Sequence, residues 1–127
     1  MGKKLAIKGH LTRGNEVIEL LKMMGGKNTA YNGTDINVIY TIDNKGIIRS
    51  LFFNNTILMK MEYDIFTLEE FLERFPYKVG DEFCNPYDKI TEMFWDEEDE
   101  IVYYKTEYSR DYVTTTDLML DNYARSR

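Results

Sequence analysis

The chain of 127 residues contains one cysteine (Cys84), one histidine (His10), two prolines and no long apolar run. A single cysteine cannot form an internal disulfide bond, which fits a reducing compartment. A single histidine with no cysteine near it gives no convincing zinc site, so we expect no bound metal. The apolar stretches are too short for a transmembrane helix, and none follows the basic N-terminus as a signal peptide requires. We therefore expect a cytoplasmic protein that does not enter a membrane.

Apolar residues are nevertheless abundant enough for a core. Hydrophobic residues make up 43% of the chain and aromatic residues 14%. Charged residues mostly lie between apolar ones, which argues against a disordered chain. At this length we expect one compact domain or two small subdomains that share a core.

Charge is distributed unevenly along the chain. Residues 1–64 hold nine Lys or Arg against six Asp or Glu, whereas residues 65–127 hold seven against sixteen. The calculated isoelectric point is about 4.8. An acidic protein lacks the counterion-release term that drives nucleic-acid binding, so we expect no direct contact with DNA or RNA.

The first half predicts a strand over residues 4–8 and then a helix. Apolar residues recur at the helical period, at Val17, Ile18, Leu21 and Met24. Thr12 is a plausible N-cap for this helix, and Gly25 with Gly26 marks its end.

The middle of the chain predicts a three-strand meander. A β-branched and aromatic run covers residues 38–42, and the turn Asp43–Gly46 leads into a second run over residues 47–53. Residues 57–63 alternate in the period of a half-buried strand. A second helix follows, because Thr67 and Glu70 have capping-box spacing between Phe66 and Phe71, which are placed as a hydrophobic staple. Pro76 ends this helix.

The second half predicts short strands over residues 77–83, 90–95, 101–105 and 112–114, with a turn at 116–118. Their even spacing is typical of a small SH3-like β-barrel. The predicted fold is therefore α+β: a strand-helix-meander-helix unit over residues 1–76, followed by a barrel over residues 77–127. The sequence leaves open whether the two parts share one core.

Two stretches, residues 9–28 and 66–81, together resemble a group of small proteins of gut bacteria and their phages. In that group a strand-helix-meander-helix unit precedes a small barrel. The resemblance covers nearly the whole chain and implies a phage or mobile-element setting, in which short acidic proteins often block host defences.

The first candidate site is the unbroken acidic run Asp96, Glu97, Glu98, Asp99 and Glu100. It lies between two predicted strands, so we expect it at a hairpin tip. The run lacks the spacing of a calcium loop and reads either as a solvated turn or as a mimic of nucleic-acid phosphates that docks on a basic groove. Alternation along the preceding strand places at least one of Phe94 and Trp95 in the core.

The second candidate site is the loop Gly9–Gly14. If Thr12 caps the helix, the free amides of the first turn favour an anion. The residues expected at such a site are Lys8, His10, Thr12, Arg13, Gly14 and Lys27. A glycine-flanked turn between a strand and a helix is also common as a purely structural connection. The alternative that this loop binds nothing therefore stays open.

No residue set resembles a catalytic site, so we expect neither an enzyme nor a cofactor. The first hypothesis is a non-catalytic module that binds a basic protein surface, and in view of the resemblance this surface belongs to a nuclease or other protein of a host defence complex, as with anti-CRISPR proteins. The alternative is a small-ligand binder that holds an anionic nucleotide at Gly9–Gly14.

Overall fold

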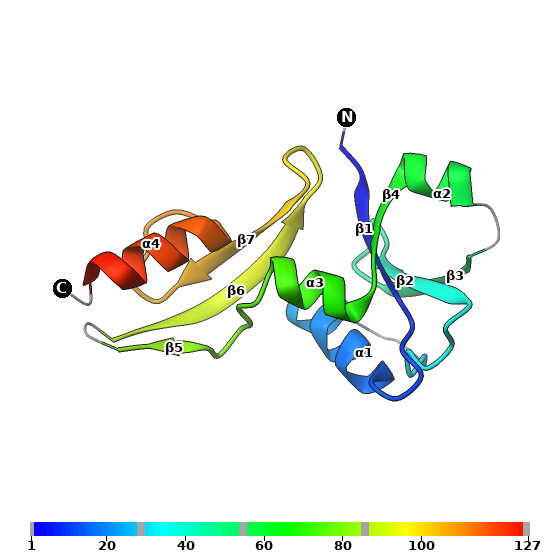
Figure 1. The fold of residues 1–127 in the computed structure, drawn as a ribbon, viewed down its shortest axis with the longest axis horizontal. Helices are drawn as coiled ribbons and strands as arrows, with labels where there is room; N and C mark the ends of the chain where they lie inside the picture. The colour runs from blue at the N-terminus through cyan, green and yellow to red at the C-terminus, as the bar shows by residue number, and fades with distance from the viewer. Residues whose placement is uncertain (1, 28–29, 54–55, 85–86, 126–127) are drawn as a thin grey trace.

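The computed structural model describes residues 2–27, 30–53, 56–84 and 87–125 and shows an α+β fold (Figure 1). Two β-sheets lie at opposite ends of the long axis, and helices α1 and α3 lie between them. The predicted fold class is confirmed at this level. Several of the predicted elements differ in the structure, and each difference is described below.

The first sheet has four strands in the order β3-β2-β1-β4. Its strands are β1 (Lys4–Lys8), β2 (Val38–Ile42), β3 (Ile48–Phe52) and β4 (Tyr63–Phe66). Strands β2 and β3 form the predicted hairpin, and β2 is antiparallel to β1. Strand β4 is parallel to β1 on its other side, so β1 lies inside the sheet and its three central residues are buried.

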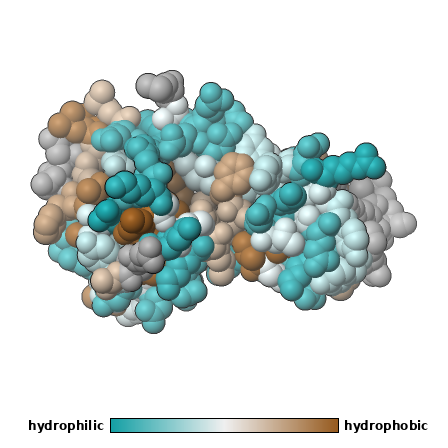
Figure 2. Space-filling model, turned by 180° about the vertical axis from the view of Figure 1, so that it is seen from behind, coloured by the Kyte–Doolittle hydropathy of each residue, from teal (hydrophilic) through white to brown (hydrophobic). Residues whose placement is uncertain are grey.

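The predicted third strand of the meander is wrong. Residues Thr56–Glu62 form helix α2, and the fourth strand starts only at Tyr63. Leucine, methionine, lysine and glutamate are good helix formers, and seven residues are too few to separate the two periodicities. Helix α2 leaves three of its apolar side chains outside, since Ile57, Leu58 and Met61 are more than 60% exposed. The corresponding corner of Figure 2, at the upper left, carries apolar residues.

Helix α1 (Gly14–Met23) ends as predicted and begins differently. At its end Gly25 has φ +101°, and Gly26 N–H donates to the Leu21 carbonyl at 2.9 Å, which is a Schellman arrangement. At its start the predicted N-cap Thr12 is wrong. The N-cap position is Arg13, which makes no side-chain capping hydrogen bond. The amides of Thr12 and Arg13, just before the helix, donate to His10, as described below.

Helix α3 (Leu68–Arg74) confirms the capping box and the staple. The Thr67 hydroxyl accepts from Glu70 N–H at 3.1 Å, and the Glu70 carboxylate accepts from Thr67 N–H at 3.0 Å. Phe66 and Phe71 pack edge to face, with ring centroids 5.8 Å apart. The helix stops two residues before Pro76, as expected.

The second sheet has three antiparallel strands, β5 (Glu82–Phe83), β6 (Asp88–Asp96) and β7 (Ile101–Thr106). The predicted SH3-like barrel is not seen, because the described residues form an open sheet here. Strand β5 is only two residues long, and the predicted strand at 112–114 is reduced to one bridge between Tyr104 and Val113. Too few strand residues remain to close a barrel.

The predicted turn at 116–118 is instead part of helix α4 (Thr115–Arg125). A second capping box starts this helix. Thr114 Oγ1 accepts from Asp117 N–H at 3.1 Å, and Asp117 Oδ2 accepts from Thr114 N–H at 3.0 Å. The spacing is the one that identified α3, with aspartate in place of glutamate. The run of β-branched threonines favoured strand and obscured this signal.

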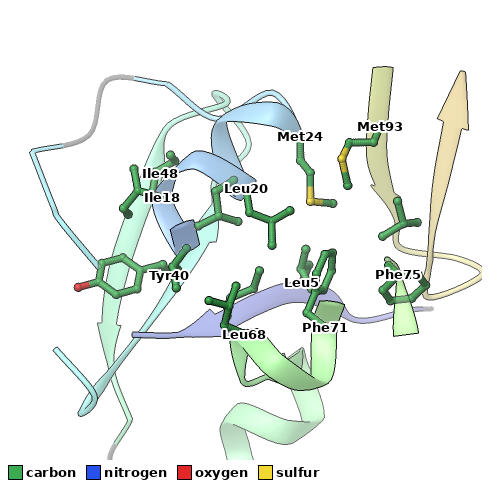
Figure 3. Packing of buried hydrophobic residues seen from close by; sticks show 14 of the residues in the cluster. Leu5, Ile18, Leu20, Met24, Tyr40, Ile48, Leu68, Phe71, Phe75 and Met93 are labelled. Carbon is green, nitrogen blue, oxygen red and sulfur yellow. The ribbon is translucent and has the colours of Figure 1, made fainter. Parts of the chain in front are cut away.

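One buried hydrophobic cluster draws residues from both predicted parts of the chain (Figure 3). Leu5 of β1, Met24 beyond α1 and Phe71 of α3 contribute from the first part, and Met93 of β6 contributes from the second. Phe75, directly after α3, lies between them and packs against Trp95 with ring centroids 6.1 Å apart. The two sheets are therefore joined by shared apolar packing around α3.

Candidate functional site

The acidic run forms the tip of the hairpin between β6 and β7, as predicted. Asp96 ends β6, and residues 97–100 form a turn in which Glu100 N–H donates to the Asp96 carbonyl at 2.8 Å. The residues Glu97, Glu98 and Asp99 are exposed, whereas Asp96 and Glu100 are half-buried. Glu100 has φ +55°, a left-handed conformation that a glutamate adopts only under some strain. Three of the five acidic residues are thus exposed.

The tip is anchored to the N-terminal strand. Trp95 Nε1 donates to the Lys3 carbonyl at 2.9 Å, and Lys3 N–H donates to the Glu100 carboxylate at 3.4 Å. The backbone of Gly2 packs so closely on the Glu97 carbonyl that a side chain at residue 2 has no room. These contacts anchor the backbone of the acidic tip to the N-terminal strand.

Asp64 on β4 lies in hydrogen-bonding contact with Glu100 of the tip. Burial raises the pKa of the half-buried Asp64 carboxyl, and the hydrogen bond and charge of Glu100 raise it further. The positive charges of Lys3 and Arg74 oppose this change in part. The contact between the two sheets therefore includes a pair of like charges that is relieved when Asp64 holds a proton.

Replacing Asp64 with asparagine is expected to stabilise the protein at pH 7. The folded state binds a proton at Asp64 more tightly than the unfolded chain does, so stability falls as pH rises from about 4 through the raised folded pKa. At low pH the wild-type carboxyl is protonated, and we expect the difference between the two proteins to shrink. Urea unfolding of the wild type and of Asp64→Asn at pH 7 and at pH 4 measures their difference in stability. An equal difference at the two pH values would contradict this role for Asp64.

The Gly9–Gly14 loop is closed by the imidazole of His10. His10 Nδ1 accepts hydrogen bonds from the amides of Thr12 at 3.2 Å and Arg13 at 3.0 Å. Because Nδ1 accepts, the ring proton lies on Nε2, which contacts the Glu69 carboxylate at 2.7 Å. Two amides of the predicted anion loop are thus satisfied within the chain, and His10 ties this loop to helix α3.

A carboxylate of the chain itself already lies at the loop. Arg13 pairs with Glu16 at 2.6 Å and approaches Glu69 at 3.8 Å. The pKa of Glu69 is held below its ordinary value, first by its own backbone amide and then by the hydrogen bond with His10. Any external anion at this loop has to compete with Glu16 and Glu69.

The structure separates the remaining residues predicted for the anion site. Gly14 is buried against the backbone of Asn32 and Gly33, and Lys8 Nζ lies 4.5 Å from the ring centre of Phe53. The backbone N–H of Lys27 donates to the Gly46 carbonyl in the β2–β3 turn, and Lys27 lies beyond the opposite end of α1. The ten residues of α1 span about 15 Å, so Lys27 does not join the loop.

A cleft of about 280 Å³ lies beside the acidic hairpin, between the two sheets. Its lining includes the apolar residues Leu5, Leu21, Met24, Phe94 and Trp95 and the polar residues Lys4, Asn44 and Glu97. Sequence reasoning missed this cleft, because it forms only where β1, α1 and β6 meet. The sequence predicted at least one of Phe94 and Trp95 in the core, and in the structure Trp95 packs against it.

Within the described residues, no group of three or more His, Cys, Asp or Glu side chains is arranged to hold a metal ion. In the same part of the chain, the helices are all too short or too polar to cross a membrane. Comparison with known proteins gives no match, either to a family model, to a curated protein or to a solved structure.

Proposed function

We propose that the chain is a non-catalytic protein-binding module whose acidic hairpin tip docks on a basic protein surface. The observation that supports this best is the anchored tip, in which Glu97, Glu98 and Asp99 are exposed on a hairpin held by Trp95 and Glu100. Holding like charges together costs free energy that a solvated turn does not require. A basic partner recovers that cost on binding, and the field of the tip accelerates encounter.

The partner in this proposal is a cytoplasmic protein with a basic groove. The resemblance to proteins of gut bacteria and their phages makes a nuclease of a host defence complex the partner of choice. The module acts by occupying the groove that otherwise receives nucleic-acid phosphates. This part of the proposal rests on the resemblance and on the charge of the tip together.

The alternative proposal, an anionic nucleotide at Gly9–Gly14, has less support from the geometry. His10 accepts hydrogen bonds from the amides of Thr12 and Arg13, and the Arg13 side chain forms a salt bridge with Glu16. This alternative would be favoured by a nucleotide that raises the melting temperature of the wild type much more than that of Arg13→Ala. Without such a ligand the loop is a structural link between α1 and α3.

Neutralising the tip tests the first proposal. The variant Glu97→Gln, Glu98→Gln, Asp99→Asn is compared with Glu19→Gln, Glu62→Gln, Glu73→Gln, which removes three exposed negative charges elsewhere. A partner is first captured from a bacterial lysate with the wild type, purified, and used to measure rates by surface plasmon resonance. We expect the tip variant to associate about tenfold more slowly, with little change in dissociation.

The control variant is expected to associate at nearly the wild-type rate, because only the local field at the tip steers the partner. Raising the salt from 0.1 M to 1 M shortens the Debye length from about 10 Å to about 3 Å and should slow the wild type toward the tip variant. Association that is equally fast in both variants and at both salt concentrations would exclude the tip as the docking site.

A further inference from the structure

The outward face of the β6–β7 hairpin carries an aromatic surface next to the acidic tip. Phe94 and Tyr103 lie directly opposite each other in the strand register, and their rings stack at 5.9 Å with an interplanar angle of 26°. Tyr112 packs edge to face on Phe94 at 4.8 Å. The neighbouring strand positions Met93, Val102 and Tyr104 face the core instead. Phe94, Tyr103 and Tyr112 are called the aromatic face below.

Carboxylates surround this aromatic face. The Tyr103 hydroxyl donates to Asp99 Oδ2 at 2.5 Å, so the Tyr103 ring is tied to the acidic tip. This hydrogen bond, burial, and the negative charges of Asp99, Asp96 and Asp117 raise the pKa of Tyr103 to about 12. The rings are therefore bordered by negative charge contributed by the tip, by β6 and by helix α4.

A cation of the chain itself already uses one of these rings. Lys105 lies opposite Glu92 in the register, and its Nζ is 5.8 Å from the centre of the Tyr112 ring. A positive charge over an aromatic ring is attracted by the negative face of the π system. Tyr112 is 49% exposed, so its ring also remains accessible from solvent.

We propose that the aromatic face and the carboxylates of Asp96 and Asp99 together bind arginine side chains of a basic protein segment. This inference rests on the proposed function and names the chemistry of the partner at the same hairpin. A guanidinium group is planar and weakly hydrated, so it stacks on rings while its N–H groups reach carboxylates. Each carboxylate accepts several hydrogen bonds, and the internal ones at Asp96 and Asp99 leave capacity for a ligand.

Two other ligands fit this face less well. Nucleic-acid bases also stack on aromatic rings. The phosphates of a nucleic acid, however, are repelled by the carboxylates of Asp96, Asp99 and Asp117. A lysine-rich segment is attracted by the same charges. Its compact, strongly hydrated ammonium groups gain less from stacking, so we expect a preference for arginine.

The test uses two fluorescein-labelled peptides of equal length, octa-arginine and octa-lysine, with binding followed by fluorescence anisotropy near 0.15 M salt. We expect the wild type to bind octa-arginine more tightly than octa-lysine. The variants Phe94→Leu and Tyr112→Leu keep an apolar side chain and remove a ring. Each should weaken octa-arginine binding several-fold, and both together about tenfold, with octa-lysine changed by less than about threefold.

Matched controls separate this inference from the proposed function. Tyr31→Leu with Phe52→Leu removes two exposed rings from the other part of the chain and should leave both affinities unchanged. The variant Glu97→Gln, Glu98→Gln, Asp99→Asn should weaken both peptides. Circular dichroism and melting temperatures verify folding, and Tyr112→Leu, at an exposed position, keeps the test open if Phe94→Leu unfolds.

Equal binding of the two peptides, or loss of a ring without effect on octa-arginine, would overturn the inference. In that case the proposed function is still supported if the variant Glu97→Gln, Glu98→Gln, Asp99→Asn binds both peptides more weakly than the wild type does. If neither peptide binds the wild type, the inference is also overturned, and the proposed function is then judged by the rate measurements on the captured partner.

Discussion

Replacing Phe71 with alanine is expected to lower the free energy of unfolding by about 3–5 kcal/mol. Phe71 is fully buried in α3, with ring centroids 5.8 Å from Phe66 and 5.1 Å from Phe75. Its removal leaves a cavity where α3 joins the two sheets. The measurement is the unfolding midpoint in urea, followed by tryptophan fluorescence, because Trp95 packs on Phe66 and Phe75.

The matched control is Phe52→Ala. The same atoms are deleted, but Phe52 is 71% exposed at the end of β3. We expect this change to lie within about 0.5 kcal/mol of the wild type. Similar losses for the two variants would mean that α3 does not pack between the sheets.

Replacing Gly14 with alanine is expected to destabilise the protein by about 1–3 kcal/mol, although alanine is the better helix former. A Cβ atom at Gly14 would lie 2.5 Å from the Asn32 carbonyl oxygen and 2.6 Å from the Gly33 carbonyl carbon. Backbone atoms cannot move aside as a flexible side chain can, so the segment at 32–34 has to shift. Thermal unfolding of Gly14→Ala measures the loss.

The neighbouring variant Asn15→Ala serves as the control, because Asn15 is exposed in the same helical turn. Helix propensity alone predicts that both substitutions stabilise α1. A stabilised Gly14→Ala would therefore show that the 32–34 segment does not pack on the helix start. The expected loss of stability also bears on the loop, since it would mean that glycine is required here for packing and not for access of an anion.

Several elements followed from the sequence because their signals are local. The capping box at Thr67 and Glu70, the Gly25 helix end and the Asp43–Gly46 turn each depend on residues within a few positions of one another. The acidic hairpin was predicted for the same reason, because two β-branched runs flank a polar turn. Local hydrogen bonds and periodicity were sufficient there.

The errors concern segments whose local preferences are balanced. Residues 57–63 alternate as a strand and also consist of helix formers, and only the parallel pairing of β4 with β1 decides where the strand starts. Residues 112–118 favour strand by composition, yet the Thr114 and Asp117 cap starts a helix. In both segments tertiary contacts, or a weaker cap signal, outweigh a small difference in propensity.

The sequence by itself determined the fold class, the position of the acidic tip and the three most local elements, α1, α3 and the β2–β3 hairpin. Only the tertiary structure decided which of the candidate residues lie together. It joined His10 to Glu69, which lies 59 residues away in the chain, and anchored the tip through Trp95 to Lys3, 92 residues away. Such contacts depend on how elements pack, and packing is set by the whole core, which no short stretch of sequence encodes.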